Sequence, residues 1–233
     1  MISIDIGWTT HGWEEAVRGM RNPMNSWSKS DSFISDFTND GKDGFVLGAS
    51  DLDLAKRLAV AGNDHSKYRR MITVYADITA PLYWWKEFDT YKVGTVANSC
   101  STMHKIADKE FTIDDFSWDQ LLNIGLDLFE FVWDNGMYAR KVQPLDFLQL
   151  FIIPSLNLCR EKYLETKDKT YWWQMIQLLP SSYNQRRTVL LNYQVLNNMY
   201  HARKNHKLDE WHDFCHWVES LPYAEELIIC NPD

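Results

Sequence analysis

The residues best suited to chemistry in this chain gather in two short polar stretches. The first, Thr90–Thr95, combines hydroxyl groups with one cation, Lys92. The second, Asn98–Thr102, adds an amide, more hydroxyls and the thiol of Cys100. Hydroxyl, amide and ammonium groups donate the hydrogen bonds that phosphates and ribose accept. The two stretches therefore predict a site for a nucleotide.

Cys100 is also a candidate nucleophile, because His104 follows it at the spacing that shares one face of a helix. A reactive thiol needs a nearby base, cation or helix N-terminus to lower its pKa. Cysteine and histidine often lie this close in a sequence by chance. We therefore do not assign a Cys100–His104 catalytic pair.

A second histidine and cysteine group, His212-x-x-Cys215-His216, has helical spacing that could bind a metal. A structural zinc site needs a fourth ligand and usually more cysteines. Large apolar residues surround the group, as expected of an ordinary packed helix. We expect no metal site.

Three further polar residues have both a structural and a functional interpretation. A helix predicted over about 183–203 places Asn192 on one stripe with Leu196 and Met199, and Arg203 one turn further on. A cation at the end of a helix also interacts favourably with the helix dipole. His65 comes just before a predicted strand, and from the residues alone it is best interpreted as a surface loop histidine.

Taken without gaps from Ala80-Pro81 to Ile106, the chain resembles the signature segment of the flavin-dependent thymidylate synthases. The family's Arg-His-Arg-x-x-Ser matches Thr90-Tyr91-Lys92-x-x-Thr95, and its Asn/Gln-Glu-x-Ser-x-Arg-Tyr matches Ala97-Asn98-x-Cys100-x-Thr102-Met103. A family histidine sixteen residues before the proline matches His65. A family asparagine and an arginine eleven residues later match Asn192 and Arg203. The resemblance is clearest over about residues 45–220.

This resemblance implies an enzyme that methylates dUMP to dTMP with methylene-tetrahydrofolate, FAD and NADPH, usually as a homotetramer. It implies that Arg203 and Cys100 take part in catalysis. The residues implied to contact the flavin are His65, Tyr91, Lys92 and Asn192, and those implied to bind the nucleotide are Thr95, Cys100, Thr102 and Arg203.

Substitutions in the signature segment leave two alternatives open. Lys92 offers a point charge where the family's arginine offers a planar fork to phosphate. One alternative is a nucleotide-binding relative that has lost flavin chemistry. The other is a structural homo-oligomer in which the aromatic helix Tyr83–Phe88 forms an interface.

Composition limits the class of protein. A chain of 233 residues with 45% hydrophobic and 24% charged residues can form one globular domain, and we predict a single domain over residues 1–233. The net charge of −8 argues against a general nucleic-acid binder but not against a small phosphorylated ligand. We find no signal peptide, no membrane-spanning apolar run and no CxxC pair, so we expect a cytoplasmic protein with no membrane partner.

Hydrophobic periodicity predicts an α+β fold, with a small mixed or antiparallel sheet packed against several helices, as the resemblance also implies. We expect strands at Ile2–Gly7 and Arg70–Thr79, and a loop over Asn22–Asp40. Pro81 fits the first turn of the helix that follows the second strand. The expected helices are Trp13–Met20, a helix capped by Ser50-Asp51 and ended by Gly62, Trp118–Asp134 capped by Ser117, Pro144 to about Lys167, Thr170–Leu179, about Tyr183–Arg203, and Asp209–Ser220.

Overall fold

A computed structural model of the chain describes residues 2–5, 9–35, 44–122, 124–133, 136 and 138–230. The chain divides into two compact units. Among the described residues, one unit contains Ala80–Lys86 and Ser99–Gln185, and the other contains the segments 2–79, 87–98 and 186–230. None of the helices in these ranges is long and apolar enough to cross a bilayer.

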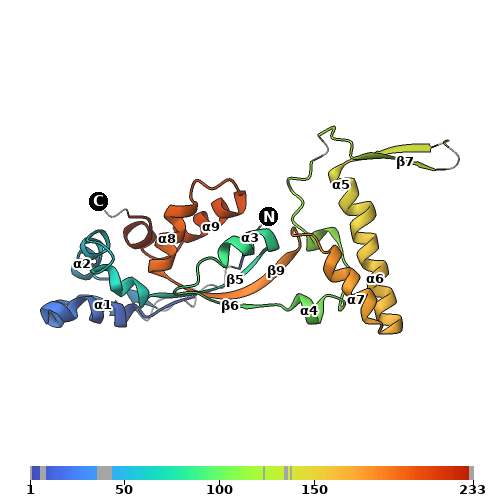
Figure 1. Ribbon diagram of the computed structural model, residues 1–233. Coiled ribbons are helices and arrows are strands. Elements are labelled where there is room, and N and C mark those ends of the chain that lie inside the picture. Colours follow the sequence, from blue (N-terminus) through green and yellow to red (C-terminus); the bar gives the residue numbers. More distant parts are fainter. Residues whose placement is uncertain are drawn as a thin grey trace. The chain divides into compact units, whose positions relative to one another are not determined.

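A small sheet organises the fold, with the strand order β1-β5-β9-β6 and with β2 also pairing with β5. Its long strands are β5 (Thr73–Pro81) and β9 (Asn184–Asn192). The shorter ones are β1 (Ser3–Ile4), β2 (Thr9–His11) and β6 (Val96–Ser99). Strands β5, β9 and β6 are labelled in Figure 1. Strands β1 and β2 run antiparallel to β5, and Thr10 pairs with Val74.

Strand β5 forms because its apolar residues recur at every second position. Val74, Ala76, Ile78 and Ala80 are all buried, and the residues between them are more exposed. This alternation with β-branched residues is typical of a strand. The predicted strand is confirmed, although it begins at Thr73 and ends with Pro81. Pro81 therefore belongs to the strand, and α3 (Leu82–Phe88) begins after it.

In the unit that contains Arg203, helix α8 (Tyr193–Arg203) is the most buried helix and packs against α9 (Asp209–Glu219). Its Leu196 and Met199 are fully buried, as are Trp211 and Phe214 of α9. Helices α1 (Trp13–Arg21) and α2 (Ala49–Val60) pack against each other. The short elements are η1 (Asn22–Met24), η2 (Trp27–Lys29), β3 (Phe33–Ile34), β4 (Phe45–Val46), η3 (Ser66–Arg70) and η6 (Glu225–Ile229).

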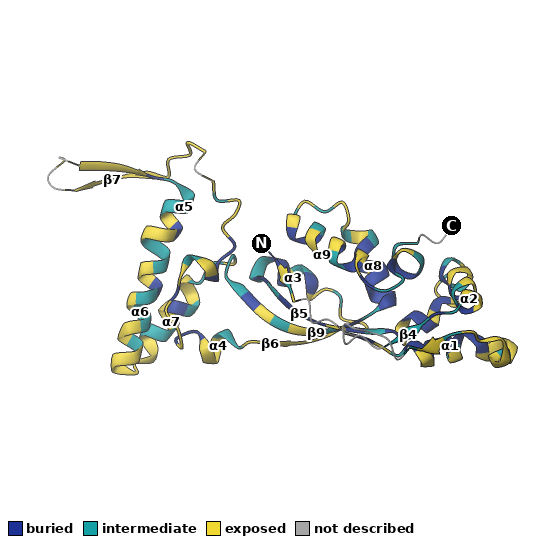
Figure 2. Cartoon of the chain, turned by 180° about the vertical axis from the view of Figure 1, so that it is seen from behind, coloured by how far each residue is buried: buried dark blue, intermediate teal, exposed yellow. Residues whose placement is uncertain are grey.

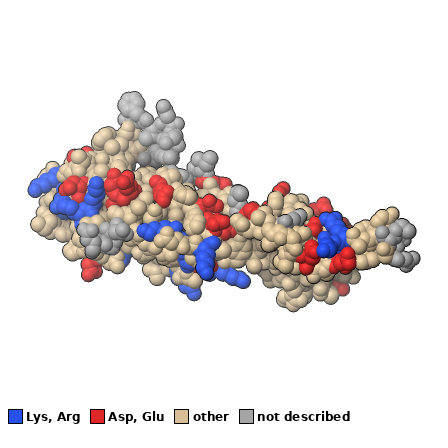
Figure 3. All heavy atoms as spheres, turned by 90° about the horizontal axis from the view of Figure 1, so that it is seen from above, with Lys and Arg blue, Asp and Glu red and all other residues tan. Residues whose placement is uncertain are grey.

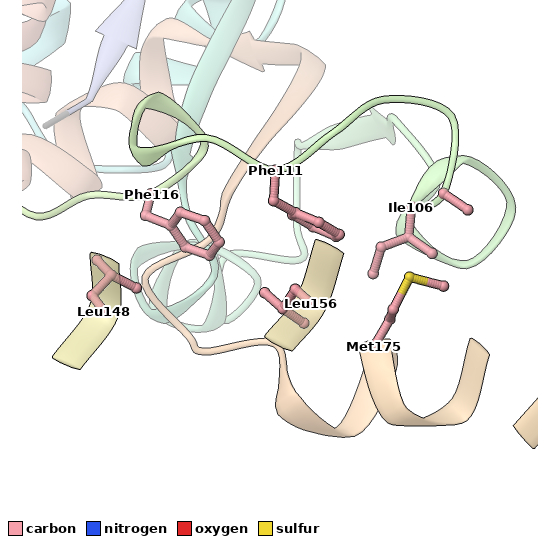
Figure 4. Close-up of a cluster of buried hydrophobic side chains, with 7 residues drawn as sticks. Ile106, Phe111, Phe116, Leu148, Leu156 and Met175 are labelled. Atoms are coloured by element: carbon pink, nitrogen blue, oxygen red, sulfur yellow. The ribbon is translucent and has the colours of Figure 1, made fainter. Parts of the chain in front are cut away.

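The other unit has a hydrophobic core to which the paired helices α6 (Ile153–Thr166) and α7 (Lys169–Leu178) both contribute. Figure 4 shows this cluster, to which Ile106, Phe111, Phe116, Leu148, Leu156 and Met175 contribute. The remaining elements are α4 (Thr102–Lys105), η4 (Ile113–Asp115), the hairpin of β7 (Phe129–Trp133) and β8 (Tyr138–Val142), α5 (Pro144–Phe147) and the π-helical turn η5 (Leu148–Ile152).

One predicted helix is wrong, and another is confirmed only in its second half. Residues 118–122 and 124–128 are not helical, Gly125 is left-handed with φ 79°, and Phe129–Trp133 is strand β7. Ser117 does not cap a helix, since its hydroxyl donates to Oδ1 of Asn184. The first part of the predicted helix over 183–203 is strand β9, and only Tyr193–Arg203 is helical. In both segments a short apolar run is compatible with the repeat of a helix, about 3.6 residues, and with that of a strand, two residues. Hydrogen bonding to a neighbouring strand makes each of them a strand.

The other predicted elements differ from the observed ones mainly at their ends. The first predicted strand is Ser3–Ile4 within the described part, since residues 6–8 lie outside it. The predicted loop over 22–40 contains two 3₁₀ turns and strand β3, and residues 36–40 lie outside the described part. Helix α2 starts at Ala49 after Gly48, so Ser50-Asp51 is inside it. Pro144 opens α5 as predicted, and α1, α6, α7 and α9 confirm the other helices.

The aromatic helix after β5 is not an exposed surface. Trp84, Trp85 and Phe88 are between 0 and 2% exposed, and the indole of Trp85 donates to the backbone oxygen of Gln185 at 2.9 Å. The buried Trp84, Trp85 and Phe88 side chains therefore leave little aromatic surface on this helix for a second chain, and the alternative in which the helix forms an oligomer interface stays a prediction.

Candidate functional site

The candidate site lies where helix α8 ends at Arg203. Arg203 Nη1 donates to Glu87 Oε2 at 2.7 Å, and Arg203 Nε donates to the Tyr91 hydroxyl at 2.9 Å. The Arg203 side chain is 17% exposed. The structure thus joins two of the predicted site residues, Arg203 and Tyr91, although they are far apart in the sequence.

Two aromatic rings flank the guanidinium. Its carbon lies 4.7 Å from the ring centre of Trp211 and 5.5 Å from that of Tyr91. At these distances the negative face of each ring attracts the cation. The rings also hold the guanidinium in a fixed plane, the geometry in which arginine forms paired hydrogen bonds.

Glu87 is the common hydrogen-bond acceptor of the site. Besides the bond from Arg203, its Oε2 accepts from the indole nitrogen of Trp211 at 3.0 Å and lies 3.2 Å from His206 Nε2. His206 Nδ1 accepts from the backbone N–H of Leu208 at 3.1 Å, which leaves the ring proton on Nε2, facing Glu87. Sequence reasoning missed Glu87 and His206 as site residues, and no local motif marks either of them.

Asn192 connects the polar turn to α8. It caps the helix, accepting from the Val195 N–H at 2.9 Å, and donates from Nδ2 to the Gly94 oxygen at 3.4 Å. Asn192 therefore precedes α8 instead of lying on its surface, which corrects the predicted stripe with Leu196 and Met199. The Thr95 hydroxyl bonds to the backbone oxygen of Tyr91, which closes the turn. Lys92 is exposed on this turn.

The remaining predicted residues lie elsewhere. His65 is exposed, just before η3, and within the described ranges no hydrogen bond or ion pair links its side chain to Arg203. Cys100 and Thr102 belong to the other unit. There Cys100 is exposed, and its backbone oxygen accepts from Gln185 Nε2 at 2.9 Å. Because α4 starts at Thr102, Cys100 is not on a helix with His104.

The His212, Cys215 and His216 group has the features of a packed helix. Cys215 is buried in α9, and this burial raises the pKa of its thiol to about 11, far from the thiolate that binds metals. In the part of the chain that the structure describes, no group of three or more His, Cys, Asp or Glu residues could hold a metal ion.

No family model matches the sequence, and no curated protein matches it. Solved structures are similar in fold. Two are of Helicobacter pylori ThyX, a flavin-dependent thymidylate synthase, with FAD and dUMP. The first has a TM-score of 0.62 at 17% identity and covers 98% of this chain and 97% of its own. The second has a TM-score of 0.61 at 17% identity, with 98% and 99% covered.

The chain has a ThyX-like fold. A third similar structure is the UMP/dUMP methylase PolB of Streptomyces cacaoi bound with 5-Br dUMP. Its TM-score is 0.58 at 13% identity, and the match covers 100% of this chain and 96% of PolB. Since these identities are low, the similarity establishes the α+β fold, and the chemistry has to be argued from the site itself.

Proposed function

We propose that this chain binds a pyrimidine nucleotide of the dUMP kind through Arg203. The observation that carries the proposal is the guanidinium packed against the rings of Tyr91 and Trp211, next to the turn that contains Lys92. A fixed guanidinium binds phosphate or the polar edge of a base, and the half-buried ring of Tyr91 offers a flat surface for stacking. The ThyX and PolB structures with this fold were solved with dUMP or 5-Br dUMP.

Within this proposal Glu87 is a competitor for Arg203. Its carboxylate oxygen Oε2 accepts a hydrogen bond from Arg203 Nη1 at 2.7 Å. A phosphate bound to the guanidinium would need the same N–H group. A nucleotide therefore has to displace Glu87 or bind beside it.

The flavin that the resemblance implies fits this site poorly. The pyrophosphate of FAD needs several N–H or O–H donors. In the turn, the hydroxyls of Thr90 and Thr95 donate to backbone oxygens of Glu87 and Tyr91, and the remaining exposed cation of the turn is Lys92. We therefore derive no reaction step through a flavin. Methylation of dUMP with methylene-tetrahydrofolate, FAD and NADPH is the second candidate function, favoured by the fold alone.

Isothermal titration of the purified chain with dUMP tests the first candidate. Charge-assisted hydrogen bonds contribute about 1.5–3 kcal/mol, so Arg203→Ala should weaken dUMP binding by about 10- to 100-fold. Arg57→Ala is the control, because Arg57 is exposed and pairs only with its helix neighbour Asp53 within the described structure. Equal affinity of wild type and Arg203→Ala, or no binding by the wild type at millimolar dUMP, would contradict the proposal.

Glu87→Gln gives a second readout of the same site. If Glu87 competes with the nucleotide, losing an ion pair of up to about 1 kcal/mol should tighten dUMP binding by up to about fivefold. Weaker binding would mean that Glu87 orients Arg203 instead.

The visible absorbance of the protein after FAD addition and gel filtration tests flavin binding separately, since a retained flavin band would support the second candidate function.

A further inference from the structure

His206 lies in the loop between α8 and α9, close to the end of α8. Its backbone N–H donates to the backbone oxygen of Arg203 at 2.9 Å, and its ring packs edge-on against that of Trp211, with centres 6.3 Å apart. Figure 2 shows this loop as exposed or half-buried, and the His206 side chain is 24% exposed. The ring is therefore fixed beside Arg203 at a place where it can exchange protons with water.

Both ring nitrogens of His206 have a defined partner. Nε2 lies 3.2 Å from Glu87 Oε2, and Nδ1 accepts from the backbone N–H of Leu208 at 3.1 Å. A neutral imidazole donates from one nitrogen and accepts at the other, so this arrangement fits the uncharged ring. A protonated ring donates from both nitrogens. It would lose the bond from Leu208 and strengthen the one to Glu87, because that bond then joins opposite charges.

The charge of the Glu87 carboxylate is shared between Arg203 and His206. In the described part of the chain these two residues are the basic partners of Glu87, and both face its Oε2. When His206 is neutral, the Arg203 guanidinium alone balances the carboxylate. When His206 is protonated, two positive charges face one negative charge. The excess positive charge attracts an anion to Arg203.

His206 has the position and the residue type that a change of charge near neutral pH requires. Histidine is the residue type whose charge changes between about pH 5 and 8. His212 also lies near the loop, but its ion pair in the described structure is with Asp209 at 3.8 Å. The other charged or titratable side chains in the loop and the segments beside it are Tyr91, Lys204, Lys207 and Glu210.

We propose that protonation of His206 frees Arg203 for an anionic ligand, because the imidazolium takes over the charge of Glu87. This inference rests on the proposed binding of a dUMP-like nucleotide at Arg203, and it adds that the affinity gains a contribution as the pH falls. His206 is a positioning residue, since it acts on the ligand through Glu87. A unit charge about 6 Å from a bound anion changes its affinity about threefold per ligand charge, even in water.

Isothermal titration with dUMP at about pH 8 and about pH 5.5 tests this inference on wild type and His206→Gln. The glutamine amide can donate to Glu87 but cannot be protonated. The phosphate of dUMP changes its own charge near about pH 6, so the measured quantity is the ratio of the two proteins' affinities at each pH. This ratio, wild type over His206→Gln, should be at least about threefold higher at the lower pH.

His212→Gln is the matched control, because His212 is 41% exposed and pairs with Asp209. Its affinity for dUMP should follow that of the wild type at both pH values. A ratio of wild type to His206→Gln that is equal at the two pH values, or that falls at the lower one, would overturn the inference while dUMP binding itself stands. Absence of dUMP binding by the wild type at both pH values would overturn the proposed function and this inference together.

Nuclear magnetic resonance titration of the His206 ring protons in the wild type covers the case in which His206→Gln unfolds. Coupling between two bound ligands is reciprocal, so bound dUMP must raise the pH at which His206 takes up its proton. The midpoint of the His206 titration should therefore move upward when dUMP is bound. An unchanged midpoint, or one that moves downward, would overturn the inference.

Discussion

The Glu87 carboxylate accepts from Arg203 and Trp211 and lies beside His206 Nε2, so one side chain determines how much of the Arg203 guanidinium a ligand can reach. The residues involved come from α3, α8, α9 and the segment between the last two. At this scale the resemblance predicted two members of the cluster, Arg203 and Tyr91. It did not predict the carboxylate between the donors, because an ion pair between distant segments leaves no local pattern.

Gly94 shows the same dependence on a distant residue. It has φ 78°, and a Cβ added there would lie 2.6 Å from Nδ2 of Asn192. We expect Gly94→Ala to lower the melting temperature and to shift the turn that carries Lys92, weakening dUMP binding. The left-handed backbone alone costs an alanine about 1–2 kcal/mol.

Gly125→Ala separates the cost of the left-handed backbone from the cost of the contact with Asn192. Gly125 has φ 79°, but no described atom lies within 4 Å of its added Cβ. Differential scanning fluorimetry should show a smaller loss for Gly125→Ala than for Gly94→Ala, and dUMP binding should stay unchanged. Equal losses in the two variants would mean that contact with Asn192 contributes nothing.

At the scale of elements, the start of α2 depends on a buried carboxylate. Asp51 is 0% exposed and pairs with Arg21 of α1, which is 4% exposed. The hydroxyls of Ser30 and Ser32 and the N–H groups of Asp31 and Ser32 also donate to Asp51. These hydrogen bonds hold residues 30–32 against α1 and α2.

Asp51→Asn should strongly destabilise the fold, because it leaves the Arg21 cation buried without its counter-charge. Breaking one side of a buried pair costs about 3–5 kcal/mol. Chemical denaturation of wild type and variant measures this cost. Asp53→Asn, which alters only an exposed pair with Arg57, should change stability by less than about 1 kcal/mol.

The Asp51 network also predicts a pH dependence. Burial alone would raise the pKa of Asp51, but hydrogen bonds from Ser32, Ser30 and Arg21 outweigh it and lower the pKa below the ordinary value of 3.8. A lowered pKa stabilises the folded state above the ordinary value, and this stability is lost as the pH falls through the folded-state pKa. The difference in unfolding free energy between wild type and Asp51→Asn should therefore be constant near neutral pH and shrink below about pH 4. A constant difference down to the lowest pH at which the wild type folds would contradict this assignment.

At the scale of the molecule, acidic and basic side chains are interspersed on the face shown in Figure 3. The chain carries a net charge of −8. A dUMP-like ligand is itself an anion, so the overall field opposes its approach and binding has to rely on local cations. This is a further reason to expect dUMP affinity to respond sharply to Arg203.

A single domain over residues 1–233 remains a prediction. Leu156 is fully buried in one compact unit and Leu196 in the other. Replacing either by alanine should cost about 2–5 kcal/mol. If the chain is one cooperative domain, both variants should lower the temperature of the same single calorimetric transition. Two transitions, each sensitive to one variant, would instead show two independently folding domains.

The sequence by itself determined the elements whose pattern is strong over a short range. Alternation identified β5, and helical spacing with caps or proline identified α1, α6, α7 and α9. The gapless run from Ala80 pointed to the α+β fold that the solved structures share. Each of these signals is contained in neighbouring residues, so no tertiary contact was needed to find it.

Only the tertiary structure decided the ambiguous segments and the partners within the site. Residues 184–192 form a strand because neighbouring strands pair with them, although their apolar run fits either period. Glu87 and His206 became site residues only when the chain brought them to Arg203. The physical reason is that periodicity is a local property, whereas the partner of a charge depends on which distant segments the core packs together.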